Sequence, residues 1–406
     1  MTEDDDAPRT GRGPTTGGVS RRGLLLAAAG LGVGGALGVG GATRFAHPGA
    51  GGAGGAGGAV GSGVPAGEPV PASGAHQAGV ARPTTPQAFG VLLALDLAPG
   101  AGLEPALAAV GREVLALTAP GHPALPDGAG DLSVTVGLGP RLVAEARPGA
   151  PGSREMTSFA GDDVLDERHR GGDVLLAAYA SNPGVLDPAL RAVAARLPVR
   201  RQRWRLPVFR GHGTEGVNRN PLGFHDGVIV PRGEEELARE VWLDEAGVAG
   251  GTIMVVRVLR LDLAGFEALA VDDQERVIGR RRVDGAPLSG GGPRDEVDLR
   301  AKSPEGQFLV PARSHARAAH PSFTGSGLML RRSYGYDLGL DAAGEPDVGL
   351  AFISFQRELR TFEATQLRMD ETDDLMTFAT PRTTATFLVL PGFSEAEPLG
   401  AGLFSP

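Results

Sequence analysis

The stretch "TIMVVRVLRLDLAGFEALAVDDQERVIGR" (Thr252–Arg280) joins two different patterns of apolar residues. Its first part, Thr252–Leu263, is a strand-like run in which apolar residues are at first nearly continuous and then alternate with charged ones. Its second part, Gly265–Arg280, spaces its apolar residues as one face of a helix does. Similar strand-like runs occur at Phe89–Leu97, Leu132–Gly139, Asp173–Ser181, Gly327–Asp337, Val348–Glu358 and Ala385–Gly392, and similar helical stretches at Gly102–Thr118, Asn182–Leu197 and Thr361–Met369.

The order of these predicted elements favours a mixed α+β fold with mainly antiparallel sheets. Their spacing lacks the regular strand–helix alternation of a doubly wound parallel sheet. Each half of the chain reads as a strand, a helix, two strands, a helix and a last strand, with the join near Val199–Gly211. We therefore predict two units, at residues 75–210 and 211–403. Two such units packed together would leave a cleft in which a cofactor could bind.

The composition narrows the functional classes. The chain has 406 residues, enough for two ordinary domains, with 41% apolar and 21% charged residues, as is usual for globular proteins. Its formal net charge of −9 disfavours a nucleic-acid binder, which needs a basic surface to replace phosphate counterions. The absence of cysteine excludes disulfides, iron–sulfur clusters, thiolate zinc sites and covalent c-type haem attachment. A metal ion would have to be held by His or carboxylate side chains, or arrive within a cofactor.

The first part of the chain has the composition of an export signal and a tether. Ser20–Ala42 begins with Arg21 and Arg22 and continues as an uncharged, weakly apolar run, which is the layout of a twin-arginine signal. A membrane-spanning helix is the alternative, but the glycines among residues 30–41 make it poor in helix propensity and in hydrophobicity. We predict a signal at residues 1–46 and a Gly/Ala/Pro-rich tether at 47–74 that contributes nothing to a core. The mature protein would then act outside the cytoplasm.

"NRNPLGFHDGVIVP" (Asn218–Pro231) is the first stretch with candidate functional residues. Its acid, Asp226, belongs to an Asp-Gly pair, which taken alone is a common turn. Of the eight histidines in the chain, three lie within patterned sequence, namely His225, His315 and His320. These histidines and Asp226 are the first candidates for a site.

"PARSHARAAHPSFTGSGLMLRRSYGYD" (Pro311–Asp337) is the second such stretch. His315 lies on a short predicted helix, and Arg331 and Arg332 lie in a predicted strand. Because side chains alternate across a strand, one of the two arginines must face inward. A buried arginine requires a counter-charge or an anionic ligand.

Three short motifs resemble the signatures of the dye-decolorizing peroxidases, and more narrowly those of their exported deferrochelatase/peroxidase branch. They are "GFHDG" (Gly223–Gly227), "SHARAAHP" (Ser314–Pro321) and "LMLRRSYGYD" (Leu328–Asp337). Further stretches match in the same order, namely "GAHQAGVARPTTPQAFGVLLALDL", "LSVTVGLGPRLV", "RGGDVLLAAYA", "QERVIGRRRVDGAPL" and "FQRELRTFEATQLRM". The resemblance therefore extends along nearly the whole predicted fold.

The resemblance implies two ferredoxin-like units with antiparallel sheets and a haem between the sheet and the helices of the C-terminal unit. One non-covalent heme b per chain is expected, with His315 as the proximal ligand of its iron. The other ring nitrogen of His315 should donate to an acid, for which we predict Asp373, with Glu358 as the alternative. Asp226 and Arg331 would lie on the opposite, distal side as the catalytic residues.

Further residues correspond to segments that contact haem in the family, namely Gly227, Val228, Ile229, His320, Pro321 and Ser322. Some positions depart from the family pattern. Val228 stands where threonine is usual, and Ser333 stands where glycine is usual after the paired arginines. His225 replaces a lysine or an apolar residue, and we favour an outer position for its ring over a role as a second distal base.

The function implied by the resemblance is a peroxidase that reduces hydrogen peroxide and oxidises a second substrate in one-electron steps. Asp226 would carry the peroxide proton, while Arg331 would keep that acid ionised and stabilise developing charge. Two alternatives stay open: a deferrochelatase-like haem-binding protein that works with components of an iron-uptake system, and a family member that binds haem without efficient turnover. The sequence leaves the reducing substrate and a homo-oligomeric state open, and it predicts no nucleic-acid partner.

Overall fold

The computed structural model describes residues 67–100, 102–211 and 217–405. The predicted export signal at 1–46 and the tether up to residue 66 lie outside the described residues. The chain divides into two segments, Met1–Gly61 and Ser62–Pro406, and only the described residues of Ser62–Pro406 are considered below. Among its described residues, no helix is both long enough and apolar enough to cross a membrane.

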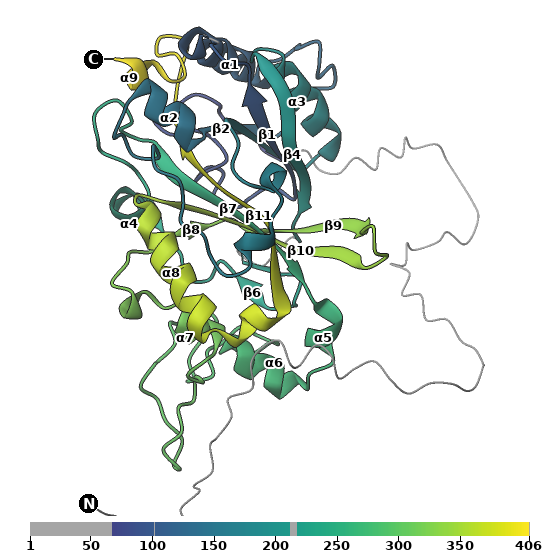
Figure 1. Ribbon diagram of the computed structural model, residues 1–406, viewed down its shortest axis with the longest axis vertical. Helices are drawn as coiled ribbons and strands as arrows, with labels where there is room; N and C mark the ends of the chain where they lie inside the picture. The colour runs from purple at the N-terminus through teal and green to yellow at the C-terminus, as the bar shows by residue number, and fades with distance from the viewer. Residues whose placement is uncertain (1–66, 101, 212–216, 406) are drawn as a thin grey trace, which may run out of the picture. The chain divides into compact units, whose positions relative to one another are not determined.

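Strands and helices are interleaved along the chain without regular alternation, as the sequence pattern predicts (Figure 1). The strands are β1 (Phe89–Leu97), β2 (Ser133–Leu138), β3 (Val174–Ala180), β4 (Val199–Phe209), β5 (Asn218–Arg219), β6 (His225–Asp226), β7 (Thr252–Leu261), β8 (Leu330–Arg331), β9 (Tyr334–Leu340), β10 (Pro346–Gln356) and β11 (Ala379–Val389). The α-helices are α1 (Leu103–Thr118), α2 (Pro140–Ala146), α3 (Leu186–Ala194), α4 (Gly233–Glu240), α5 (Leu263–Glu267), α6 (Val271–Ile278), α7 (His315–Ala318), α8 (Leu359–Thr372) and α9 (Ala401–Phe404). Among the short 3₁₀ helices, η5 (Pro321–Phe323) and η6 (Asp374–Phe378) border the site.

The large sheet is built from two units with the same strand order. The first unit pairs its strands in the order β2-β3-β1-β4, and the second pairs them in the order β11-β7-β10-β9, all antiparallel. Pairings of β11 with β2 and of β4 with β9 join the two units, so the sheet closes on itself. Each unit therefore has the ferredoxin-like order of strands and crossover helices. The predicted α+β fold of two ferredoxin-like units with antiparallel sheets is confirmed.

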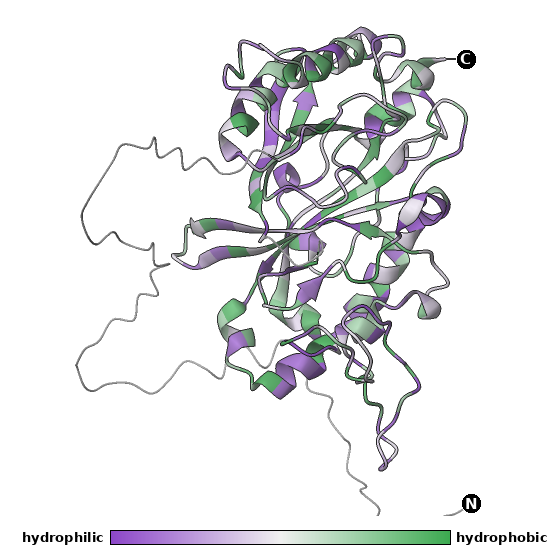
Figure 2. Ribbon diagram, turned by 180° about the vertical axis from the view of Figure 1, so that it is seen from behind, coloured by the Kyte–Doolittle hydropathy of each residue, from purple (hydrophilic) through white to green (hydrophobic). Residues whose placement is uncertain are grey.

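Strands β1, β2, β3 and β7 are buried on both faces because each face packs against a different apolar layer. Leu93 of β1 belongs to the core cluster that includes the inner face of α1, whereas its neighbour Leu92 belongs to a second cluster shared by strands of both units. Figure 2 shows green and purple alternating along the helices that cover the sheet, as expected of helices with one buried face. Side chains therefore fill most of the interior on both faces of the sheet. A cavity for a ligand remains in the second unit.

Two boundaries in the structure differ from those that the sequence predicts. Val70 and Ala72, which we placed in a tether without core residues, are buried, and Ala72 belongs to the largest core cluster. The packed chain thus begins within the predicted tether at 47–74, because both of these side chains are buried. The predicted strand at Gly327–Asp337 is divided into β8 and β9 at Arg332 and Ser333. The unit boundaries 75–210 and 211–403 stay predictions.

A buried ion pair joins a loop of the first unit to the sheet of the second. Arg257 Nη1 of β7 donates to Asp162 Oδ1 over 2.8 Å, and both side chains are almost completely buried, at 2% and 1% exposure. The guanidinium also lies over the ring of Phe159, with 5.0 Å between its central carbon and the ring centre. The loop that follows α2 is therefore held against the central strand of the second unit.

We expect Asp162→Ala to lower the free energy of unfolding by about 3–5 kcal/mol, because it leaves the buried Arg257 without its counter-charge. The neighbouring Asp163→Ala is the control, since Asp163 is exposed and its loss should change stability by less than about 0.5 kcal/mol. Urea unfolding of the two variants measures both values. Equal stabilities would show that the pair contributes nothing.

Candidate active site

A large cavity lies in the second unit between the β7–β10 face of the sheet and helices α6, α7 and α8. It holds about 1660 Å³ of empty space, part of which is open to solvent. Its walls are mainly apolar and include Leu259, Leu261, Ile278, Leu350 and Phe352. Its lining residues come from strands β7 and β10, helices α6, α7 and α8 and the β5–β6 hairpin, as expected of a site for a wide ligand.

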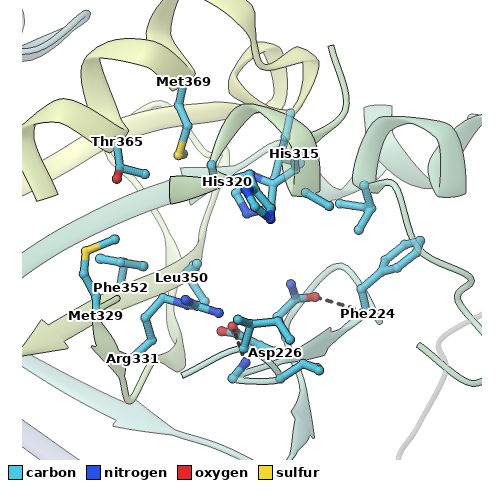
Figure 3. A pocket seen from close by; sticks show the side chains of 18 of the residues that line it. Phe224, Asp226, His315, His320, Met329, Arg331, Leu350, Phe352, Thr365 and Met369 are labelled. Atoms are coloured by element: carbon cyan, nitrogen blue, oxygen red, sulfur yellow. Dashed lines mark hydrogen bonds between the residues drawn. The ribbon is translucent and has the colours of Figure 1, made fainter. Parts of the chain in front are cut away.

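His315 begins α7 and stands at one side of this cavity (Figure 3). Its Nδ1 lies 2.7 Å from Asp373 Oδ2, so the ring donates from Nδ1 and turns Nε2 away from Asp373. About 37% of the side chain is exposed, and it is the cavity that provides this exposure. Burial acts to lower the pKa of His315, but the charge and hydrogen bond of Asp373 outweigh it and raise the pKa.

Asp373 is held in place by the chain on both sides of it. It follows the last residue of α8, and its Oδ1 accepts a hydrogen bond from the backbone of Leu375 over 2.9 Å. A parallel contact joins the neighbours of the pair, because Arg313 Nε donates to Asp374 Oδ1 over 2.5 Å. The predicted contact between His315 and Asp373 is therefore present. The alternative, Glu358, is exposed and precedes α8 at its other end, so the structure excludes it as the partner of His315.

Asp226 ends the short hairpin formed by β5 and β6, and it too faces the cavity. The turn of the hairpin is held by Asn220, whose Oδ1 accepts from the backbone of Leu222 and Phe224. Gly227 follows with φ +74° and donates its N–H to Asp226 Oδ1 over 2.6 Å. A Cβ at Gly227 would meet no atom, so glycine is needed for its backbone conformation. The bend therefore aims a short acid into the cavity with little freedom to move.

Arg331 and Arg332 point to opposite sides of the strand, as alternation requires. Arg331 lines the cavity and forms no hydrogen bond or ion pair with any described residue. Figure 3 shows Arg331 and Asp226 together on the side of the cavity opposite His315. Arg332 is buried and donates to the backbone oxygens of Val80 and Pro83, and burial lowers its pKa to about 10.

The remaining predicted contact residues are placed as follows. Gly227, Val228, Ile229, His320 and Pro321 line the cavity. Ser322 does not; it is exposed and lies 2.8 Å from His320 Nδ1, because the η5 turn directs it to the surface. A contact of Ser322 with the cofactor stays a prediction.

His225 lines the outer part of the cavity, and its ring packs against the backbone of Asp284 and Gly285. Burial, followed by the charge of Arg219, lowers the pKa of His225. The ring is therefore neutral at neutral pH and is turned toward a loop.

Sequence reasoning missed Arg280 and Glu296 of the cavity wall. Arg280 is 9% exposed and donates to the backbone oxygens of Gly285 and Asp295. Its signals in the sequence are its place after the helix-ending Gly279 and its position within the family-like stretch "QERVIGRRRVDGAPL". In the described part of the chain, no group of three or more His, Cys, Asp or Glu side chains could hold a bare metal ion.

These features define a site for a wide, mainly apolar cofactor that receives a single imidazole ligand. The Nε2 lone pair of His315 is free, the opposite side offers an acid and a guanidinium, and the walls between them are apolar. A haem has this shape and needs these donors, so the residues fit it.

The comparisons with known proteins agree with this class. The family model "Dyp-type peroxidase, C-terminal" matches residues 217–394. The chain is 34% identical to the dye-decolorizing peroxidase of Thermobifida fusca over 370 residues, which cover 81% of this chain and 84% of that protein. It is 30% identical to the deferrochelatase of Escherichia coli K12, over 80% of this chain and 84% of that one. The chain belongs to the dye-decolorizing peroxidase family, and it is accordingly a haem-dependent peroxidase that uses hydrogen peroxide and a reducing substrate.

Solved structures show the same fold. The oxyferrous complex of DtpA from Streptomyces lividans is 32% identical, with a TM-score of 0.77 over 84% of this chain and 98% of that one. A DyP-type peroxidase from Cellulomonas bogoriensis is 31% identical, also with a TM-score of 0.77, over 84% of this chain and 99% of that one.

We expect Asp373→Asn to lower the pKa of His315 in the haem-free protein, because burial then acts without the opposing carboxylate. With Asp373 present, the raised pKa contributes stability below the unfolded value of about 6.5 and loses it as the pH rises through the folded value. The variant should lack this contribution. NMR titration of the histidine ring measures the pKa, and Glu358→Gln is the control that should leave it unchanged. If Glu358→Gln lowered the pKa of His315 and Asp373→Asn did not, Glu358 and not Asp373 would be the partner of His315.

Proposed function

We propose that His315 holds one non-covalent heme b per chain, and that Asp226 and Arg331 carry out the peroxide chemistry opposite it. The observation that carries this proposal is the arrangement of the three side chains around one apolar cavity, with His315 fixed by Asp373 (Figure 3). A chain without cysteine cannot form thioether links to haem, which supports non-covalent binding.

When bound, haem supplies a redox-active iron at which the O–O bond of peroxide is cleaved and a second substrate is oxidised. The chain supplies the proton transfer. Asp226 accepts the proton of the peroxide oxygen nearer the cofactor and returns it to the outer oxygen, which leaves as water. Arg331 stabilises the negative charge that develops as the bond breaks, and it can do so because no described residue occupies its hydrogen bonds.

The departures from the family pattern are compatible with this mechanism. Val228 is 8% exposed, and its side chain adds to the apolar wall where threonine would add a hydroxyl. Ser333 is 5% exposed and is not among the residues that line the cavity. Neither position removes Asp226 or Arg331 from the cavity, so we favour an active peroxidase over a family member that binds haem without turnover.

We expect Asp226→Asn to lower the peroxidation rate of the haem-loaded protein by about 10²–10⁴-fold, the usual contribution of a proton-transfer group. Arg331→Leu should lower it by about 10²–10³-fold, as loss of a charge-stabilising donor does. Asp337→Asn, at an exposed position of β9, is the control for loss of a carboxylate. Steady-state oxidation of a small phenol measures the rates, and the haem absorbance of each variant separates catalysis from haem binding.

Retention of the parent rate by both variants would contradict the proposed roles. The same reaction distinguishes peroxidation from a second candidate function, haem-iron acquisition. The similarity to a protein named deferrochelatase supports this second function. Release of iron with an intact porphyrin, in place of oxidised phenol, would favour haem-iron acquisition together with components of an iron-uptake system.

We further propose that the twin-arginine signal at residues 1–46 exports the protein from the cytoplasm. Replacing Arg21 and Arg22 by lysine should abolish export, because this pathway reads the arginine pair. Replacing Arg9 and Arg12 by lysine is the control, since these lie outside the pair. Fractionation of the producing cells measures the location, and normal export of the Arg21/Arg22 variant would overturn the proposal.

A further inference from the structure

The cavity concentrates the methionines of the chain. The sequence contains six, and Met329, Met369 and Met376 line this cavity. Methionine fills irregular apolar gaps well, so packing explains part of this choice. Its thioether is also oxidised to the sulfoxide by peroxide, and the chain has no cysteine to compete. A cavity that receives peroxide therefore has oxidisable groups in its own wall.

The three methionines occupy different surroundings. Met369 and Met376 are partly exposed, and the sulfur of Met376 accepts a hydrogen bond from Gln366 Nε2 over 3.8 Å. Figure 3 shows Met369 on the side of His315, whereas Met329 lies with Arg331. Met329 itself is only 8% exposed. Solvent access alone would thus favour Met369 and Met376 over Met329.

Met329 and Arg331 share one face of the chain. They are two residues apart, and Leu330 between them belongs to the core cluster on the other face of the sheet, together with its strand partner Phe355. Both Met329 and Arg331 line the cavity. Met329 and Arg331 therefore reach the same cavity from neighbouring positions of the chain.

We propose that Met329 is a modification site, at which hydrogen peroxide bound beside Asp226 and Arg331 oxidises the thioether to the sulfoxide and so limits the activity. This inference rests on the proposed function. The sulfur lone pair attacks one peroxide oxygen, an S–O bond forms and the O–O bond breaks. The other oxygen takes up the proton of the transferred oxygen and leaves as water. The sulfur loses the electron pair that peroxide gains, so no other reagent is required.

The sulfoxide would act on Arg331. Its oxygen is a strong hydrogen-bond acceptor, and Arg331 forms no hydrogen bond with another described residue. Arg331 would donate to this oxygen and would be drawn away from Asp226 and the peroxide. Because methionine sulfoxide can be reduced enzymatically, the loss of activity would be reversible. Met329 would then register the amount of peroxide that the enzyme has processed.

The first test compares haem-loaded and haem-free protein after addition of peroxide, with peptide mass spectrometry at each methionine. In the haem-free protein, the more exposed Met369 and Met376 should gain oxygen before Met329. In the haem-loaded protein the order should invert, with Met329 oxidised first, because peroxide is then bound beside Arg331. Met254, which is 0% exposed, and Met156, which lies outside the cavity, are internal controls. An unchanged order in the haem-loaded protein would overturn the proposal.

The second test uses Met329→Leu, which keeps the side-chain volume but removes the sulfur. We expect its activity, relative to its own starting rate, to decline several-fold more slowly over repeated additions of peroxide than that of the parent. Met156→Leu should decline as the parent does. A decline of Met329→Leu at the parent rate would refute the effect on activity. Failure of the proposed function is distinct, because it would appear as absence of peroxidation at the start, before any methionine is oxidised.

Discussion

The hydrogen bond between Asp373 and His315 is the contact on which the rest of the site depends. A carboxylate that is 3% exposed is costly to bury unless both its oxygens are satisfied, and here one accepts from the imidazole and the other from the backbone of Leu375. The same contact determines which ring nitrogen carries the proton and leaves the other free to act as a ligand. It also ties the start of α7 to the end of α8, so the imidazole is held by two helices.

The closed sheet explains why the functional groups come from short, irregular elements. Strands β1, β2, β3 and β7 are buried along almost their whole length, and a polar side chain there, such as that of Arg257, needs a partner in the core. Asp226 therefore comes from a small hairpin, Arg331 from the two-residue strand β8, and His315 from a helix of a single turn. These three elements border the cavity on the face of the second unit that α8 covers.

The buried pair of Arg257 and Asp162 links this arrangement to the other half of the protein. Arg257 lies on the sheet face that forms part of the cavity wall, while Asp162 belongs to a loop of the first unit. The two ferredoxin-like units are thus joined by strand pairing and also by a charge pair beside the site. A change in the packing of the first unit would therefore reach the cavity wall without a direct contact with any ligand.

The sequence by itself determined the α+β class, the order of the elements and the family, because these depend on local periodicity and on short motifs such as "GFHDG" and "SHARAAHP". It also identified His315 and Asp226 as candidates. Only the tertiary structure decided between Asp373 and Glu358, since the partners are 58 residues apart in one case and the helix α8 separates the two acids. It likewise turned Ser322 outward. Such choices depend on burial and on contacts between distant segments, and a local pattern carries no information about either.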